Sequence, residues 1–118
     1  MISEHFSRGE FKCHCGKCAC DTVDGELLDL LEAVRRYFKA PVTVTSGMRC
    51  VSHNITIGGK PGSQHLLGKA ADIVVKGVEP DRVAAFAEGL LEFKGGIGRY
   101  QKFTHLDVRD AKARWAGQ

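Results

Sequence analysis

The sequence predicts an α+β domain in which two helices pack on one face of a small, mostly antiparallel sheet. Three observations predict it: two stretches with helical apolar periodicity, several short β-branched or apolar runs bounded by Gly and Pro, and a length of 118 residues. That length is enough for one hydrophobic core. We therefore expect a single domain over residues 1–118, whose residues 1–20 form an irregular, cysteine-rich lead-in.

The first predicted helix follows the lead-in. Its apolar stripe, spaced i, i+4, i+7 and i+11, consists of Leu27, Leu31, Val34 and Phe38. Asp24 is a suitable N-cap, and Pro41 ends the helix because it has no backbone N–H. Residues 42–46 alternate and are rich in β-branched side chains, which predicts a strand.

Loops and a buried strand are expected next. The pairs Gly58-Gly59 and Pro61-Gly62 predict turns and loops across residues 51–62. Residues 70–75 form a short apolar run between Gly68 and Gly77, which is typical of a buried strand.

The C-terminal third predicts a second helix and a last strand. Pro80 is suited to a first helical position, and the expected apolar face consists of Val83, Phe86, Ala87 and Leu90. Gly95-Gly96 predicts a turn, and residues 103–108 predict the final strand. Because strand side chains alternate, Phe103, His105 and Asp107 should share a polar face, opposite an apolar one made by Thr104, Leu106 and Val108.

Composition and charge are typical of a soluble globular protein. The hydrophobic content of 43% and the charged content of 26% are ordinary, and the net charge of +3 is mild. Lys and Arg are scattered, so a nucleic-acid partner is not expected, whereas an anionic partner such as a bacterial cell wall suits a pI near 8.7. Without a secretory signal or an apolar run long enough for a bilayer, we expect synthesis in a cytoplasm and no membrane insertion.

Three residues are candidate metal ligands. Asp72 lies inside an apolar strand, where an ionised carboxylate needs a positive partner such as a metal ion or an Arg. His65 precedes it by seven residues, and His105 lies in the last strand. Two imidazoles and one carboxylate are the ligands of a catalytic Zn²⁺ that keeps one position open. Arg49, after a strand and a Gly turn, is a candidate for binding a substrate carboxylate.

Several motifs occur in an order that resembles a known family. They are Ser46-Gly47-Met48-Arg49, His53-Asn54, Gly58-Gly59, the segment from Ser63 to Asp72, Gly96-Ile97-Gly98 and the segment from Phe103 to Arg109. This pattern is similar to that of the zinc D-Ala-D-Ala carboxypeptidases, which include phage endolysin peptidases and share their fold with the Hedgehog signalling domain. The resemblance covers nearly the whole chain, from about Phe6 to Trp115.

The resemblance implies roles for individual residues. Zn²⁺ would be held by His65, Asp72 and His105, and Arg49 would bind the substrate's terminal carboxylate. Ser63 and Gln64 would line the cleft. Many members carry a general base two or three residues before the last ligand, but here Phe103 and Lys102 stand at those positions. Asp107 is therefore expected to act as the base, or to orient His105.

The expected function is that of a zinc metallopeptidase acting on peptidoglycan stem peptides or cross-links, as in a phage or prophage lysis enzyme released through a membrane hole. The alternatives are a non-catalytic zinc-binding module or a structural phage component of the same fold. The sequence does not say which peptide bond is cut or which oligomer forms.

Five cysteines are many for a chain of this kind. Four of them crowd into one short segment as Cys13, Cys15, Cys18 and Cys20, while Cys50 stands alone. The cluster is interpreted as a loop of reduced thiols, as disulfides formed after release, or as a second, structural zinc site.

Overall fold

A five-stranded sheet forms the centre of the computed structural model, which describes residues 2–117. The spatial order of its strands is β1 (Val42–Ser46), β2 (Ala70–Val75), β4 (Thr104–Asp107), β3 (Gly96–Arg99) and β5 (Ala113–Ala116). All neighbours pair antiparallel except β3 and β5, which are parallel. The predicted α+β class with a mostly antiparallel sheet is confirmed.

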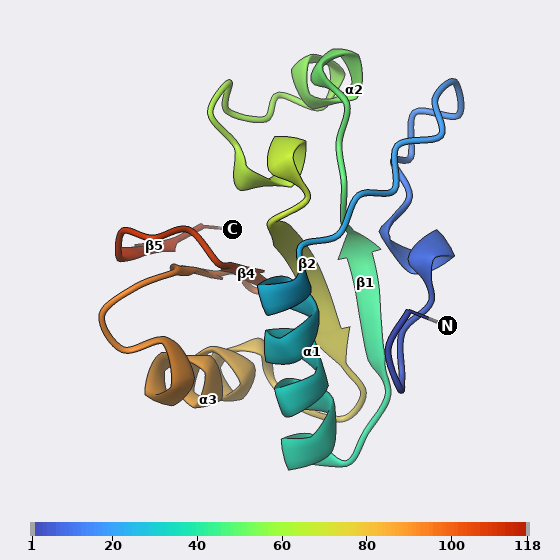
Figure 1. Cartoon of the computed structure of the whole chain (residues 1–118). Helices are drawn as coiled ribbons and strands as arrows, with labels where there is room; N and C mark the ends of the chain where they lie inside the picture. The colour runs from blue at the N-terminus through green and yellow to red at the C-terminus, as the bar shows by residue number, and fades with distance from the viewer. Residues whose placement is uncertain (1, 118) are drawn as a thin grey trace.

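Helices α1 (Gly25–Phe38) and α3 (Pro80–Leu91) pack against each other and against one face of this sheet (Figure 1). These are the two predicted helices. Two 3-10 turns, η1 (Arg8–Phe11) and η2 (Gln64–Leu67), and the short helix α2 (Val51–Thr56) complete the described elements. In Figure 1, α2 and η2 lie beyond the carboxyl end of β1 and leave the sheet face opposite α1 and α3 uncovered by helices.

Helix α1 begins after its predicted N-cap, Asp24, and ends three residues before Pro41, which was predicted to end it. The Asp24 carboxylate accepts a hydrogen bond from the Glu26 backbone N–H at 2.8 Å, which satisfies one of the free donors of the first turn. The helix ends at Phe38 because Lys39 adopts a left-handed conformation with φ of 52°, two residues before Pro41. Leu27, Leu31 and Val34 are fully buried against the sheet.

Two predictions about helices were wrong. Residues 51–56 form helix α2, because the Cys50 sulfur caps it by accepting a hydrogen bond from the His53 backbone N–H. The glycines and Pro61 that predicted a loop follow this helix and do not interrupt it. On α3 the buried side chains are Val83, Ala84, Ala87 and Leu91, whereas Leu90 is exposed.

The strand nearest the C-terminus also differs from expectation. Residues 103–108 were predicted to form the last strand. Residues 104–107 of this range form β4, but β5 follows and pairs in parallel with β3, with Gly98 opposite Trp115. Strand β3 lies between β5 and β4, and its Gly98 is the cross-strand partner of both Trp115 and His105. Because Gly98 has no side chain, the Trp115 ring extends over it to His105, and the two ring centroids lie 4.9 Å apart. The extra strand therefore contributes directly to the site described below.

The lead-in is irregular apart from η1, but it is part of the core. Phe6 and Phe11 are buried in the same apolar cluster as α1 and the sheet. The Glu32 carboxylate on α1 accepts hydrogen bonds from the Ser3 hydroxyl at 2.6 Å and from the His5 backbone N–H at 2.7 Å. These contacts attach the N-terminal segment to the first helix.

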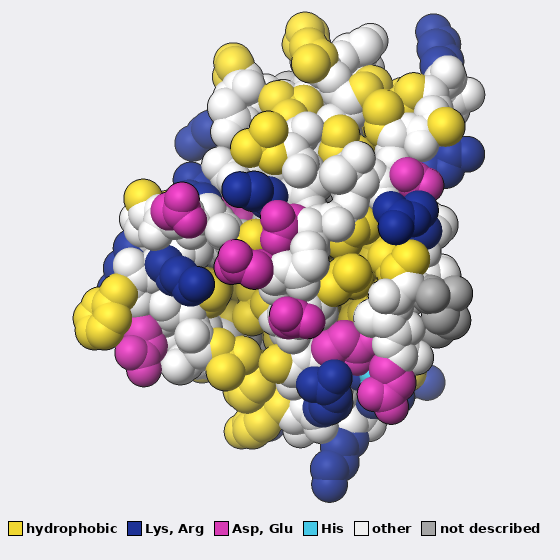
Figure 2. Space-filling model, in the orientation of Figure 1, with side chains coloured by type: hydrophobic (Ala, Val, Ile, Leu, Met, Phe, Trp, Pro, Cys, Tyr) yellow, Lys and Arg dark blue, Asp and Glu magenta, His cyan; other side chains and the backbone are white. Residues whose placement is uncertain are grey.

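The surface carries mixed charges. Figure 2 shows acidic and basic side chains intermixed over α1 and α3, with apolar side chains gathered at the end of the molecule formed by α2. Val51, Ile55 and Ile57 are exposed there. No helix within residues 2–117 is long and apolar enough to cross a membrane.

Candidate metal centre

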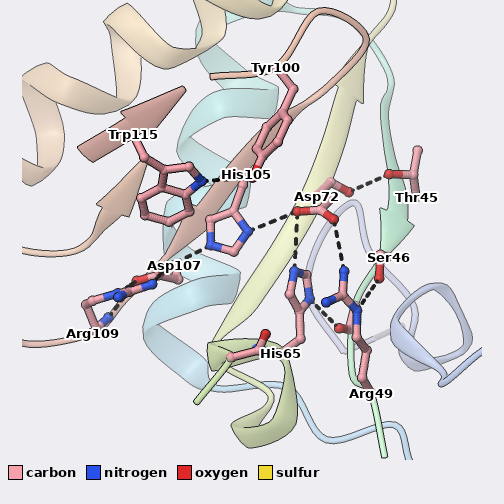
Figure 3. A network of polar contacts seen from close by, with 12 residues as sticks. Thr45, Ser46, Arg49, His65, Asp72, Tyr100, His105, Asp107, Arg109 and Trp115 are labelled. Carbon is pink, nitrogen blue, oxygen red and sulfur yellow. Dashed lines mark hydrogen bonds and ion pairs between the residues drawn. The ribbon is translucent and has the colours of Figure 1, made fainter. Parts of the chain in front are cut away.

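His65, Asp72 and His105 come together on the sheet face opposite α1 and α3 (Figure 3). Asp72 on β2 and His105 on β4 are direct cross-strand partners, so their side chains leave the sheet on the same face. His65 reaches them from η2, which precedes β2. One ligand atom from each residue lies within 4.8 Å of the other two, and all three residues are buried.

Each imidazole has a hydrogen-bond partner that fixes which ring nitrogen faces Asp72. The Gly47 carbonyl lies 2.7 Å from His65 Nδ1, and because a carbonyl only accepts, Nδ1 carries the proton. The other nitrogen, His65 Nε2, lies 3.3 Å from Asp72 Oδ1. On His105 the order is reversed: Nε2 contacts the Asp107 carboxylate at 2.8 Å, and Nδ1 lies 3.0 Å from Asp72 Oδ1.

The donor set fits a zinc ion. Donor atoms in a tetrahedral site with bonds of ~2.0–2.1 Å lie about 3.3 Å apart. The separations from Asp72 Oδ1, 3.3 Å to His65 Nε2 and 3.0 Å to His105 Nδ1, are close to that spacing. Burial alone would raise the pKa of Asp72, but hydrogen bonds from His105 and His65 outweigh it and hold the pKa well below its usual range. Asp72 is thus an ionised, buried carboxylate, as a metal ligand must be.

Asp107 lies behind His105 and away from the pocket. Its side chain is fully buried, and Arg109 grips both carboxylate oxygens, with Nε 2.8 Å from Oδ1 and an Nη atom 2.7 Å from Oδ2. Oδ2 also receives the contact from His105. Despite the burial, the hydrogen bonds from Arg109 and His105 keep the pKa of Asp107 far below its usual range. This geometry favours orientation of His105 over the alternative of a proton acceptor.

Room for the Asp107 carboxylate comes from Gly96 on the neighbouring strand. Gly96 and Asp107 are cross-strand partners of β3 and β4. A Cβ atom on Gly96 would overlap the Asp107 carboxylate. A residue without a side chain is therefore required next to Asp107.

Arg49 reaches the same centre from the β1–α2 connection. An Nη atom lies 3.4 Å from Asp72 Oδ2, Nε donates to the Ser46 hydroxyl at 3.2 Å, and the other Nη donates to the Asn54 side-chain oxygen at 3.4 Å. Burial lowers the pKa of Arg49, and the nearby charge of Asp72 opposes that shift. The long contacts to Asp72 and Asn54 leave the guanidinium able to bind a further anion.

A pocket of about 770 Å³ opens over the three candidate ligands. Ser63, Gln64 and Arg49 line it. The Ser63 hydroxyl also accepts a hydrogen bond from the His65 backbone N–H at 3.2 Å, which stabilises the turn that carries His65. Among the described residues, Asp72 is the one carboxylate in the lining.

Four further residues of the site were not predicted for these roles. They are Asn54, Tyr100, Arg109 and Trp115. Trp115 donates to the Tyr100 hydroxyl at 2.8 Å, and the Arg109 guanidinium lies 5.3 Å from the centroid of the Trp115 ring. Arg109 could have been found from its charge and its position two residues after Asp107, the last residue of β4. Nothing in the sequence pattern indicates that Tyr100 and Trp115 meet.

A small α+β domain with two histidines and one aspartate at the floor of an open pocket is the arrangement of a metallopeptidase. The chain belongs to the Peptidase M15 family, whose sequence profile matches residues 4–107. This is a family of zinc-dependent peptidases, in agreement with the resemblance inferred from the motifs. No curated protein matches the chain at a significant level.

Proposed function

We propose that this chain is a zinc metallopeptidase that hydrolyses peptidoglycan stem peptides or cross-links, and that it serves as a phage or prophage cell-wall lysis enzyme. The observation that carries the proposal is the convergence of His65 Nε2, Asp72 Oδ1 and His105 Nδ1 within 4.8 Å at the floor of an open pocket. Three protein ligands leave a fourth position for water or substrate.

The chain's own residues would hold and orient the metal. His65 and His105 each present one unprotonated nitrogen when the ion is bound, because the Gly47 carbonyl and the Asp107 carboxylate fix the opposite ring nitrogen as the donor. Bound zinc supplies a Lewis acid for the scissile carbonyl and lowers the pKa of water to about 7. Asp107 is assigned the orienting role, since both its oxygens are occupied.

Arg49 would position the peptide. Its guanidinium faces the pocket from the side of Asp72, and its planar fork can hold a carboxylate by two hydrogen bonds. Holding that carboxylate places the neighbouring amide within attack distance of the metal centre. Ser63 and Gln64 line the same pocket and offer hydrogen bonds to the peptide backbone.

The charge of the pocket supports an anionic peptide. Within residues 2–117, its lining contains the cationic side chains of Arg49, Lys60 and Arg109 and a single acid, Asp72, which faces the candidate ion. Stem peptides of the bacterial wall carry free carboxylates, and a positive pocket attracts them. The mild positive charge of the whole chain, +3, acts in the same direction.

Turbidity of a suspension of purified cell walls tests the proposal. The zinc-loaded protein should clear the suspension, a chelator should stop clearing, and added zinc should restore it. Asp72→Ala should abolish clearing, whereas Asp29→Ala, an exposed carboxylate on α1, should not change it. Mass spectrometry of the released fragments would identify the bond. Clearing that survives both the chelator and Asp72→Ala would contradict the proposal.

A zinc-binding module without peptidase activity is the second candidate. It is favoured by one observation: within the described pocket, Asp72 is the only carboxylate, and Asp107 is enclosed by His105 and Arg109. In that case the protein would bind wall peptides with zinc present, but fragments would not be released.

A further inference from the structure

Four of the five cysteines form a second cluster, apart from the candidate peptidase centre. The sulfur atoms of Cys13, Cys15, Cys18 and Cys50 all lie within 4.8 Å of one another. Cys13, Cys15 and Cys18 come from the lead-in after η1, and Cys50 comes from the N-cap position of α2, 37 residues beyond Cys13. The fifth cysteine, Cys20, is not a member of the cluster.

The sulfur positions match a tetrahedral metal site. The sulfurs of Cys13 and Cys50 are 3.8 Å apart, and those of Cys15 and Cys18 are 3.3 Å apart. Four thiolates around Zn²⁺ with bonds of ~2.3 Å lie about 3.8 Å from one another. All five cysteines are free in this structure, so no covalent bond accounts for the convergence.

Backbone N–H groups point at these sulfurs. Lys17 donates to Cys15 Sγ at 3.3 Å, Cys50 donates to Cys13 Sγ at 3.4 Å, and His53 donates to Cys50 Sγ at 3.4 Å. Hydrogen bonds of this kind stabilise the charged, deprotonated form of a thiol, which is the form that binds metal. Lys12 and Lys17, which adjoin the cysteines in sequence, add positive charge to a segment that would hold four thiolates.

We propose that Cys13, Cys15, Cys18 and Cys50 bind a second, structural zinc ion. Four protein ligands close the coordination sphere, so this ion would take no part in hydrolysis. The inference rests on the sulfur geometry and is independent of the proposed peptidase function. It selects one of the three interpretations that the sequence left open.

The location explains what such an ion would do. The Met48 backbone N–H donates to the Phe11 carbonyl at 2.9 Å, and a Cβ atom on Gly47 would lie 2.7 Å from Phe11 Cα. The lead-in therefore already lies against the connection that carries Arg49. An ion bound by both Cys13 and Cys50 would hold the lead-in against this connection. The connection carries Arg49 and Gly47, and the Gly47 carbonyl orients His65.

Metal content per chain tests the proposal. Protein purified under reducing conditions and loaded with zinc should lose one zinc per chain on the change Cys18→Ser. The matched control Cys20→Ser, in the same segment but outside the cluster, should lose none. The comparison is repeated in a His105→Ala background. If the peptidase centre then holds no zinc, the total zinc per chain falls, but Cys18→Ser should still hold one zinc fewer than Cys20→Ser.

A second measurement uses the unaltered chain and does not depend on whether a variant folds. Cobalt(II) bound to four thiolates gives a strong thiolate-to-cobalt charge-transfer absorption in the near ultraviolet, and cobalt bound to His and Asp does not. We expect this absorption in the unaltered chain loaded with cobalt(II), and its absence there would overturn the proposal. The proposal would be overturned by equal zinc content in Cys18→Ser and Cys20→Ser. It would also be overturned if freshly purified protein contained iron with a visible iron–sulfur spectrum, or a disulfide between Cys13 and Cys50 or between Cys15 and Cys18.

Discussion

His105 Nε2 lies 2.8 Å from Asp107 Oδ2, and the Arg109 guanidinium donates two hydrogen bonds to the same carboxylate. A series of hydrogen bonds thus connects Arg109 to Asp107 and Asp107 to His105. It leaves Nδ1 of His105 directed at the position expected for the ion. A carboxylate behind a metal-binding histidine fixes the tautomer and the ring orientation. Figure 3 shows this series on one side of Asp72 and Arg49 on the other.

Replacing Asp107 tests whether it orients His105. We expect Asp107→Asn to lower zinc affinity at the peptidase centre about 10- to 100-fold, the usual effect of losing such a partner. A competition titration with a fluorescent chelator measures the affinity, and Asp110→Asn, an exposed neighbour, serves as the control. Unchanged zinc affinity together with lost turnover would instead assign Asp107 the role of general base.

The contact between Gly96 and Asp107 leads to a stability prediction. In Gly96→Ala the new methyl group meets the buried Asp107 carboxylate, and overpacking of this kind costs about 1–3 kcal/mol. Gly89→Ala is the matched control, because Gly89 lies within α3 with open space around it and should gain about 0.5–1 kcal/mol. Denaturant unfolding of both variants measures the difference, and equal stabilities would refute the assigned contact.

Arg49 leads to a prediction about substrate binding. Arg49→Lys keeps a positive charge near Asp72 but cannot donate two parallel hydrogen bonds to one carboxylate. The affinity for a stem peptide should therefore fall by about 10-fold or more. Calorimetry with a peptide bearing a free terminal carboxylate, and with its amide, measures this effect. The variant and the wild type should bind the amide equally well. A similar loss for both peptides would show that Arg49 does not contact the carboxylate.

Glu32 leads to a pH prediction. Burial would raise the pKa of Glu32, but hydrogen bonds from Ser3 and His5 outweigh it, so its pKa in the folded chain is lowered. The unfolded chain then binds more protons between the two pKa values, and stability rises with pH in that window. This contribution is fully present above the unfolded pKa of ~4.3 and is lost as pH falls through the folded value.

Chemical denaturation of Glu32→Gln across pH 3–7 checks this prediction. The variant should be less stable than the wild type at pH 7, and the gap should narrow at the acidic end. Asp29→Asn, an exposed change on the same helix, should leave the stability nearly unchanged at every pH. A gap that widens on acidification would contradict the lowered pKa of Glu32.

The local parts of the fold could be predicted from the sequence. The stripe from Leu27 to Phe38 and the cap at Asp24 predict α1, although the helix ends before Pro41, and the runs at 42–46 and 70–75 match β1 and β2. Helix α2 was missed because its sequence has no apolar periodicity facing a core, and its cap is the sulfur of Cys50. Strand β5 was missed because a parallel partner is set by packing across the sheet and leaves no local signal.

For the candidate site, too, some residues could be predicted from the sequence, whereas other roles depend on the tertiary structure. His65, Asp72 and His105 could be identified because a histidine and a carboxylate among apolar residues need a partner, and the segment from Ser63 to Asp72 matches a known family. Whether Asp107 accepts a proton or orients His105 depends on its contact with Arg109 and on the space over Gly96. Both features are set by the tertiary structure. The convergence of Cys50 with three cysteines of the lead-in likewise depends on the fold.

A crystal structure of the zinc-loaded protein, with anomalous scattering recorded on both sides of the zinc absorption edge, tests the peptidase centre most directly. We expect a zinc peak bonded to His65 Nε2, Asp72 Oδ1 and His105 Nδ1, with one coordination position facing the pocket. A zinc-replete crystal without a peak at this position, or with any of the three side chains directed elsewhere, would contradict the assignment.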